Sequence, residues 1–251
     1  MTDGSAATAP EPARPAYYAA RPGRWRDWWT LLHPPYTAWH LSYVLIGAAL
    51  APRVTLMPLT TALIAFFLAV GVAAHALDEL HGRPLRTRIP AAALVTAAAV
   101  SLAGAFGLGI YGIGHAGWLL VPFMIAGPLL VVAYNAELFG GIVHTDTGFA
   151  AAWGAFPVLT GYVAQTGRIA VAPVLAAAAA HAMSLAQRRL STPARALRRR
   201  TAAVTGSITL ASGEVTALDA PYLLAPLEQA LRAMSWAIAL LAAGLAVARL
   251  T

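Results

Sequence analysis

Histidine and carboxylate side chains gather where a long apolar stretch ends. Residues 75–83 read HALDELHGR, and they follow residues 56–74, which contain no charged side chain. His75 and Glu79 are four residues apart and Asp78 is three from His75, so one face of a helix would present an imidazole beside a carboxylate. Imidazole and carboxylate groups are common metal ligands. The spacing therefore predicts a metal-binding or catalytic site at the end of this stretch.

The composition predicts a membrane protein. Of 251 residues, 59% are hydrophobic and 11% are charged, with a mean hydropathy of +0.66, whereas soluble domains have about 25% charged residues. Cysteine is absent, which excludes disulfides, zinc–thiolate sites and cysteine nucleophiles. A metal would need histidine and carboxylate ligands. No basic helix with interleaved aromatic residues occurs, so nucleic acid is not expected as a partner.

Seven apolar runs approach the length of about 20 residues that spans a bilayer. They cover residues 36–52, 57–80, 90–112, 116–136, 147–166, 169–188 and 223–249. We therefore expect an all-α, polytopic transmembrane helix bundle of about seven spans, forming a single domain over residues 31–251. In the last run Glu228 and Arg232 are four apart, which fits either an interfacial helix before a shorter span or a buried ion pair.

The first thirty residues have no apolar core of the kind a signal peptide needs. Their Ala- and Pro-rich composition predicts a disordered cytoplasmic tail over residues 1–30 with an aromatic, interfacial end. The aromatic residues expected to form a belt at the inner leaflet are Trp25, Trp28, Trp29, Tyr36 and Trp39.

Arginine placement predicts the orientation of the bundle. With the N-terminus inside, the outer segments hold only Arg53, Arg168 and Arg249. By the positive-inside rule the protein is then a multi-pass protein of the cell inner (plasma) membrane with a cytoplasmic N-terminus. Residues 191–221 form an inner-face loop, where the alternation in SITL and EVTAL around Ala-Ser-Gly predicts a short β-hairpin.

In this orientation the polar residues of several spans lie near their inner ends. They are His40, His75, Asp78, Glu79, Tyr134, Asn135, Glu137 and His181. Ionisable groups at membrane depth are costly and usually mark function, so we expect one inner-facing pocket. A single histidine could instead be an interfacial or hydrogen-bonded residue, and Asp78 and Glu79 could cap the helix or pair with Arg83 or Arg86. His81 and His144 are expected in solvent.

The order of these features resembles the UbiA superfamily of intramembrane prenyltransferases. HPPYTAWHLSYVLIGAALAP is similar to the first helix of that family, and AHALDELHGRPLRTRIP to the end of its second helix, where an N-D-x-x-D motif precedes an R-P turn. AYNAELFGGIVHTDTGFAAAWGAFPVLTGYVAQTG resembles the region from the fourth to the fifth helix of the quinone-precursor prenyltransferases. The resemblance covers about residues 30–190. It implies a helical bundle around a cavity open to the bilayer, with a diphosphate bound through Mg²⁺ on two Asp-rich motifs.

The chain departs from the pattern of that family in three places. Aligning Asp78 with the second Asp of the first motif puts Ala74 at the Asn and His75 at the first Asp. Imidazole is a poor ligand for Mg²⁺ and a good one for Zn, Fe, Ni or Cu. The second motif, D-x-x-x-D, is missing from HAMSLAQRRLSTPARALRRR, where His181 and Gln187 are the only stand-ins. The family usually has nine helices, two more than the apolar runs found here.

The resemblance implies a prenyltransferase-like enzyme that transfers or cyclises an isoprenoid diphosphate or a similar lipid-soluble substrate. Asp78 and Glu79 would then hold Mg²⁺, and Tyr134 and Asn135 would be catalytic. Asn135 would also bind substrate, together with the arginines that neutralise phosphate, Arg83, Arg86 and Arg88.

Two alternatives remain open. One is a membrane enzyme of another class on this scaffold, such as an oxidoreductase, which binds Fe, Zn, Mn or Cu. Its candidate ligands are His75, Asp78, Glu79, Glu137, His181 and His40. The other is a non-catalytic protein that binds lipid or quinone. The expected partners are a lipid-soluble small molecule and membrane lipid.

Overall fold

The structure, a computed structural model, describes residues 14–250 and is mostly helical. The first half of the chain forms α1 (Arg24–Leu31), α2 (Pro34–Ala49), α3 (Leu56–Phe66), η1 (Phe67–Ala74), α4 (His75–Leu80), α5 (Ala91–Ala116), η2 (Trp118–Leu120) and α6 (Val121–Asn135). The second half forms η3 (Leu138–Gly141), α7 (Asp146–Ala150), η4 (Ala151–Ala155), α8 (Phe156–Thr166), α9 (Val171–Arg199), β1 (Ser207–Thr209), β2 (Val215–Ala217) and α10 (Ala220–Leu250).

Each apolar run of the sequence is helical, and within residues 14–250 four of the resulting helices are long and apolar enough to cross a membrane. These are Leu56–Leu80, Ala91–Ala116, Trp118–Asn135 and Ala220–Leu250. Only a helix satisfies all the backbone polar groups of one segment internally, as an apolar bilayer requires. These four helices indicate a membrane protein.

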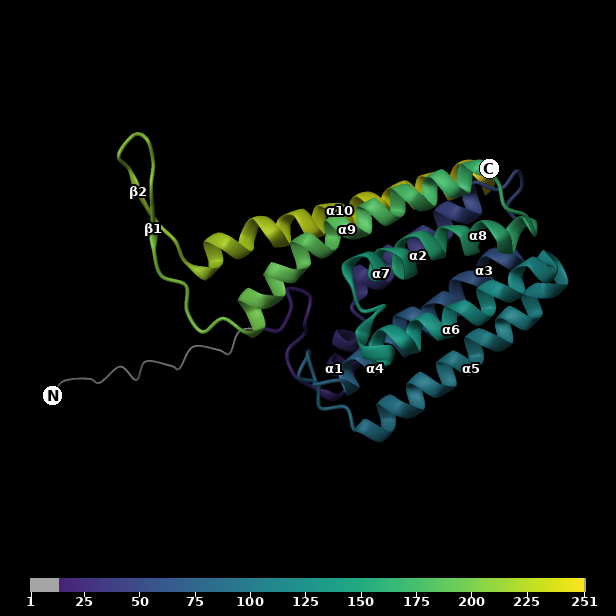
Figure 1. Cartoon of the computed structure of the whole chain (residues 1–251), viewed down its shortest axis with the longest axis horizontal. Helices are drawn as coiled ribbons and strands as arrows, with labels where there is room; N and C mark the ends of the chain where they lie inside the picture. The colour runs from purple at the N-terminus through teal and green to yellow at the C-terminus, as the bar shows by residue number, and fades with distance from the viewer. Residues whose placement is uncertain (1–13, 251) are drawn as a thin grey trace.

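The count of four corrects the seven spans expected from the sequence. Helix α2 has only 16 residues, and the second half of α9 is rich in arginine. The segment from α7 to α8 includes Asp146, Gln165 and several glycines and threonines, which lower its hydropathy. The helices nevertheless lie alongside one another in one bundle, and α9 and α10 run side by side along its length (Figure 1).

Helices α2 and α8 approach each other closely because glycine lies on both. A Cβ atom on Gly47 would lie 2.0 Å from the carbonyl oxygen of Val158, and one on Gly161 would lie 2.2 Å from that of Val44. Small residues allow this kind of backbone contact between membrane helices. Gln165 of α8 holds the loop between α2 and α3, because its side-chain oxygen accepts from the N–H of Thr55 and its side-chain nitrogen donates to the carbonyl of Thr55.

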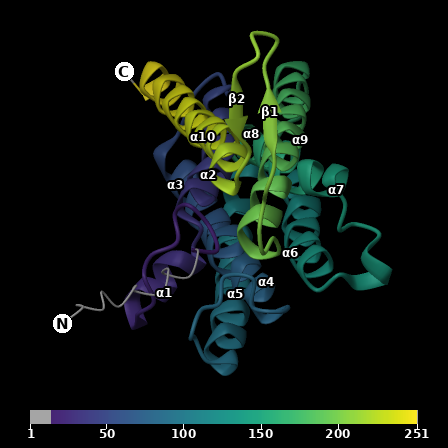
Figure 2. The same ribbon diagram turned by 90° about the vertical axis from the view of Figure 1, so that its left-hand side faces the viewer.

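The predicted hairpin is confirmed, and it extends away from the bundle beyond the ends of α9 and α10 (Figures 1 and 2). Strands β1 and β2 are antiparallel, with Ile208 opposite Thr216, and Gly213 takes a φ of 86° in the turn. Helix α10 starts directly afterwards at Ala220 and runs without interruption through the two charged residues expected near its start. Glu228 is 8% exposed and pairs mainly with Arg198 of α9. The expected partner Arg232 lies 3.9 Å from Glu228 and its side chain is 55% exposed, so the buried ion pair of Glu228 is formed with another helix and not with Arg232.

Residues 14–31 are packed against the bundle, although the sequence predicted a disordered tail there. Ala16 and Ala19 are buried. Asp27 of α1 accepts hydrogen bonds from the backbone N–H groups of Gly23 and Arg88, which ties this segment to the loop after α4. The remainder of the predicted tail, residues 1–13, lies outside the described residues.

The aromatic belt is found only in part. Trp25 and Trp29 are exposed, as side chains in a membrane interface would be. Trp39 is 1% exposed and packs edge-on against Tyr43 in the core. Tyr36 lines an internal pocket. The prediction was wrong for these two residues because consecutive turns of α2 face the other helices.

Candidate functional site

Two cavities of opposite character lie inside the bundle. The first, of about 440 Å³, is the apolar chamber, which lies among α3, α5, α6 and α8 and is lined by side chains such as Phe66, Phe123 and Phe156. The second, of about 350 Å³, is lined by polar side chains of several helices and by five arginines of the α9 end, and we call it the arginine pocket. Trp153 lines both cavities. The site can therefore accommodate a ligand with one apolar and one polar end.

The arginines of the pocket come from the last turns of α9 and the residue after it. They are Arg188, Arg195, Arg198, Arg199 and Arg200. Their helix ends beside the N-terminal segment, so residues from opposite ends of the chain line the same pocket. The N-terminal residues are Pro15, Ala16, Tyr17, Tyr18 and His33.

Two histidines of the pocket bond to carbonyls within π-helical turns. His40 Nδ1 lies 2.9 Å from the carbonyl oxygen of Trp153 in η4, and His75 Nδ1 lies 3.0 Å from that of Gly71 in η1. A carbonyl only accepts, so Nδ1 carries the proton in both rings and Nε2 of the neutral ring is left as an acceptor. π-Helical turns occur often at functional sites, and here they fix the orientation of both imidazoles.

A third histidine, His33, stacks on His75. Their ring centroids are 4.2 Å apart and their planes differ by 13°, and the Tyr18 hydroxyl lies 3.0 Å from His33 Nδ1. Burial, with the neighbouring His75 ring as a second cause, lowers the pKa of His33 well below its usual range. His33 also has a φ of 46° just before Pro34, a conformation that is uncommon for a residue with a side chain. His33 therefore offers a neutral ring rather than a cation.

Several polar atoms that line the arginine pocket are buried without a hydrogen-bond partner among the described residues. They are the hydroxyls of Tyr17 and Tyr134, Nε2 of His33 and Oε1 of Gln187. A buried polar group without a partner costs about 1–3 kcal/mol. Because these atoms come from different segments of the chain and belong to residues that line one pocket, a polar ligand or water held there would satisfy them.

Aromatic rings gather around Trp153, the residue that lines both cavities, and we call this group the aromatic junction. The ring centroid of Tyr134 lies 4.9 Å from that of Trp153 and 4.4 Å from that of His144, on which it stacks. Phe149 stacks on Trp153 with their ring centroids 6.0 Å apart. The guanidinium of Arg188 lies 5.1 Å above the Phe149 ring. Aromatic faces stabilise cations, so a positive charge that develops at this junction would be stabilised.

The structure brings together five of the residues predicted for the site. His40, His75, Asp78, Tyr134 and Asn135 all line the arginine pocket. The amide of Asn135 already donates to the carbonyl of Val131 within its own helix, which leaves its oxygen for a ligand.

Glu79, predicted from the sequence as a catalytic residue and metal ligand, does not line the arginine pocket. Its side chain is 0% exposed. It accepts hydrogen bonds from the N–H of Leu85 at 2.9 Å, and from both the N–H and the hydroxyl of Thr87 at 2.8 Å. The loop after α4 folds back over the helix end, and Glu79 holds it there.

The predicted phosphate-binding arginines also lie elsewhere. Arg83 donates to the carbonyl of Ile89 within its own loop, and Arg86 and Arg88 are exposed. None of the three lines the arginine pocket. They support the loop or face outward because the loop turns away from the cavity after Glu79.

The predicted metal ligands are not gathered around a common point. Glu137 is half-exposed, 4.0 Å from His81 and 3.9 Å from His144, and His181 lies outside the residues that line the arginine pocket. Within residues 14–250, no three histidine, aspartate or glutamate side chains form a group that could hold a metal ion. His81 is exposed as expected, whereas His144 lines the pocket and stacks on Tyr134, contrary to the prediction.

Sequence reasoning missed the arginines of α9 and the role of His33. From the sequence, the arginines of α9 indicate only the orientation of the bundle in the membrane. A signal was present, because Arg188, Arg195 and Arg199 are seven and then four residues apart, which places them on one face of a helix. Nothing local connects that face to His33, which is more than 150 residues away in the sequence.

Comparisons with models of known protein families, with curated proteins and with solved structures found no match to this chain. The resemblance to the UbiA superfamily thus depends on the motifs alone.

Proposed function

We propose that the protein is a UbiA-like membrane enzyme whose substrate is an isoprenoid diphosphate or a similar lipid with an anionic headgroup. The headgroup would lie in the arginine pocket and the hydrocarbon tail in the apolar chamber. The observation that supports this is the pair of cavities of opposite polarity that share Trp153. A wholly apolar ligand would leave the arginine pocket without a complementary partner, and a wholly polar ligand would leave the apolar chamber without one.

The aromatic junction supports prenyl transfer or cyclisation as the reaction. The C–O bond of the allylic diphosphate would break with its electron pair leaving on the diphosphate, and the allylic cation would form beside Tyr134, Trp153 and Phe149. A π bond of an acceptor, or of the same chain, would capture the cation. The proton then lost would pass to Asp78, the carboxylate of the pocket that is not held by Arg198.

The placement in the membrane is part of the proposal. The four long apolar helices would cross the bilayer, and the shorter and more polar helices of the bundle would be shielded by their neighbours. The end that carries α1, the hairpin and most arginines would face the cytoplasm of the cell inner membrane, in accordance with the positive-inside rule.

The test is ligand binding to the purified full-length protein in nanodiscs, measured by calorimetry. Farnesyl diphosphate is expected to bind more tightly than farnesol, which lacks the headgroup, and more tightly than isopentenyl diphosphate, which has a short tail. Equal affinities for all three would contradict the two-cavity assignment. Release of diphosphate over time then distinguishes an enzyme from a lipid-binding protein.

A pair of glycine variants tests the chamber. Gly127→Leu adds a side chain that points at the Phe156 ring, 3.6 Å from the Cβ position, whereas Gly107→Leu projects into open space. We expect Gly127→Leu to weaken farnesyl diphosphate binding by about tenfold or more, since it removes room for several buried methylene groups at about 0.8 kcal/mol each. Gly107→Leu should bind like the unmodified protein. An unchanged affinity in Gly127→Leu would remove the chamber from the site.

A further inference from the structure

The carboxylates of the arginine pocket do not suit a magnesium–diphosphate site. Mg²⁺ prefers oxygen ligands, usually from carboxylates together with substrate phosphate. The pocket is lined by two carboxylates, Asp78 and Glu228. Glu228 is held by Arg198 through both of its oxygens and also lies 3.9 Å from Arg232. Among the described residues, Asp78 is then the one carboxylate of the pocket left to bind a cation, whereas the resemblance implies two Asp-rich motifs. The neighbouring imidazoles bind Mg²⁺ poorly.

The same pocket has cations without anionic partners. Within the described part of the chain, Arg195 and Arg199 form no ion pair with a carboxylate, and the only side-chain bond of Arg195 goes to the hydroxyl of Thr192 at 3.3 Å. Both side chains are half-buried. Partly buried like charges that share a cavity repel each other, so a bound anion would relieve this repulsion.

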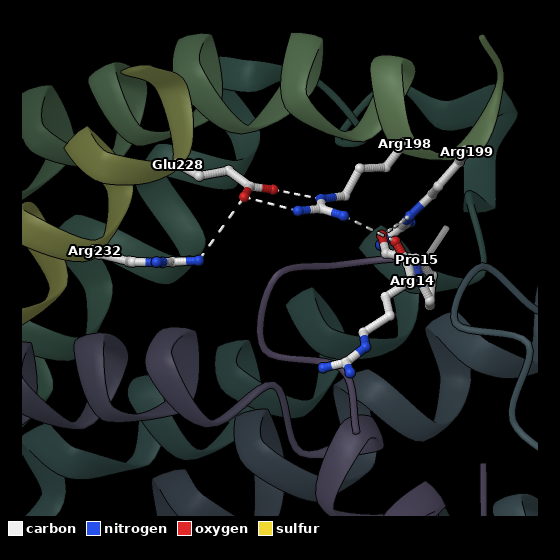
Figure 3. A network of polar contacts seen from close by, with 6 residues as sticks. All are labelled: Arg14, Pro15, Arg198, Arg199, Glu228 and Arg232. Atoms are coloured by element: carbon white, nitrogen blue, oxygen red, sulfur yellow. Dashed lines mark hydrogen bonds and ion pairs between the residues drawn. The ribbon is translucent and has the colours of Figure 1, made fainter. Parts of the chain in front are cut away.

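Backbone carbonyls of the N-terminal segment occupy some of the guanidinium donors (Figure 3). Arg199 Nε donates to the carbonyl of Pro15 at 3.0 Å, and Arg198 Nη1 donates to that of Arg14 at 3.3 Å. These are the donor groups that bind phosphate oxygens in proteins, where the planar guanidinium makes two parallel hydrogen bonds to the anion. The two carbonyl oxygens therefore mark positions where oxygens of a phosphate could be bound instead.

We infer that the arginine pocket binds the phosphate groups of its lipid through guanidinium groups, chiefly those of Arg195 and Arg199, and without a divalent metal ion. The inference rests on the proposed function, of which it specifies the headgroup subsite. The arginines of α9 take the place of the metal and of the second Asp-rich motif that the chain lacks. The planar, permanently charged guanidinium also binds phosphate by two parallel hydrogen bonds.

The experiment measures farnesyl diphosphate binding to the full-length protein in nanodiscs, once with Mg²⁺ and once with EDTA. The variants are Arg195→Gln and Arg199→Gln, and the matched control is Arg189→Gln, an exposed arginine of the same helix that does not line the pocket. We expect similar affinity in both buffers. Each pocket variant should bind about 10–100-fold more weakly, the equivalent of one charged hydrogen-bonded contact of about 1.5–3 kcal/mol, while Arg189→Gln binds normally.

Sodium pyrophosphate in EDTA tests the headgroup subsite without the tail. If pyrophosphate binds and Arg195→Gln weakens it, the inference holds even where farnesyl diphosphate does not bind, and only the proposed lipid substrate is then refuted. Three results would overturn the inference. They are loss of binding in EDTA, equal effects of Arg195→Gln and Arg189→Gln, and absence of pyrophosphate binding in both buffers. Far-UV circular dichroism of each variant checks that the helices are retained.

Discussion

The sharpest prediction concerns the adjacent carboxylates Asp78 and Glu79, to which the structure gives different roles. Glu79 is buried and accepts three hydrogen bonds from the loop after α4, whereas Asp78 lines the arginine pocket. We therefore expect Glu79→Gln to lower stability and Asp78→Asn to alter binding or turnover with little change in stability. Sequence reasoning alone assigned both residues to the site.

The magnitude for Glu79→Gln follows from its bonds. The amide oxygen of glutamine can replace the carboxylate oxygen that accepts from Thr87. The amide NH₂ then faces the N–H of Leu85, and because both groups are donors this hydrogen bond is lost. Loss of that one charged hydrogen bond costs about 1.5–3 kcal/mol. At about 2–4 °C per kcal/mol for a chain of this size, the unfolding temperature should fall by about 3–12 °C. Glu79→Ala, which leaves all the loop donors unpaired, should cost more.

Thermal unfolding in detergent, followed by far-UV circular dichroism, measures this effect. The matched control is Glu214→Gln, which changes an exposed carboxylate in the hairpin turn and should unfold at the same temperature as the unmodified protein. The reasoning would be refuted by a Glu79→Gln variant that unfolds normally yet no longer binds or converts its ligand. Glu79 would then belong to the site after all.

Three further predictions use the same unfolding measurement. Gly161→Ala should lower the free energy of unfolding by about 1–3 kcal/mol, because the added Cβ overlaps the α2 backbone. The control Gly107→Ala has open space around its Cβ and should be neutral or stabilising. Equal effects of the two variants would contradict the close contact between α2 and α8. Glu228→Gln should cost about 3 kcal/mol, since it leaves the largely buried Arg198 without its anion. The pKa of His33 is lower in the folded protein than its usual value of about 6.5, so the unfolded state binds more protons below that pH. Stability should therefore fall as the pH drops below about 6.5, and His33→Gln should flatten this dependence.

The membrane character and the helical elements followed from the sequence because they depend on local properties. Long apolar runs leave the backbone no polar partner but its own carbonyls, so each run becomes a helix wherever it packs. The hairpin was predictable for the same reason, since two alternating segments lie only a few residues apart. The number of helices that are apolar enough to span a membrane was overestimated, because shorter and more polar segments also form helices within the bundle.

The site could be predicted only in part. The sequence places polar residues near one end of several helices, and five of them do line one pocket. It does not show which of two adjacent carboxylates faces that pocket, because this depends on where the N–H groups of Leu85 and Thr87 lie after the loop folds back.

The sequence by itself determined that this chain forms apolar helices with histidine, carboxylate and arginine side chains concentrated near one end. Tertiary structure alone decided that the end of α9 meets the N-terminal segment, so that Arg199 donates to Pro15 and shares a pocket with His33. The physical reason is the separation along the chain of the residues that interact. Helix formation is decided by neighbours a few residues apart, whereas a pocket is made by side chains far apart in the chain that only the packing of whole helices brings together.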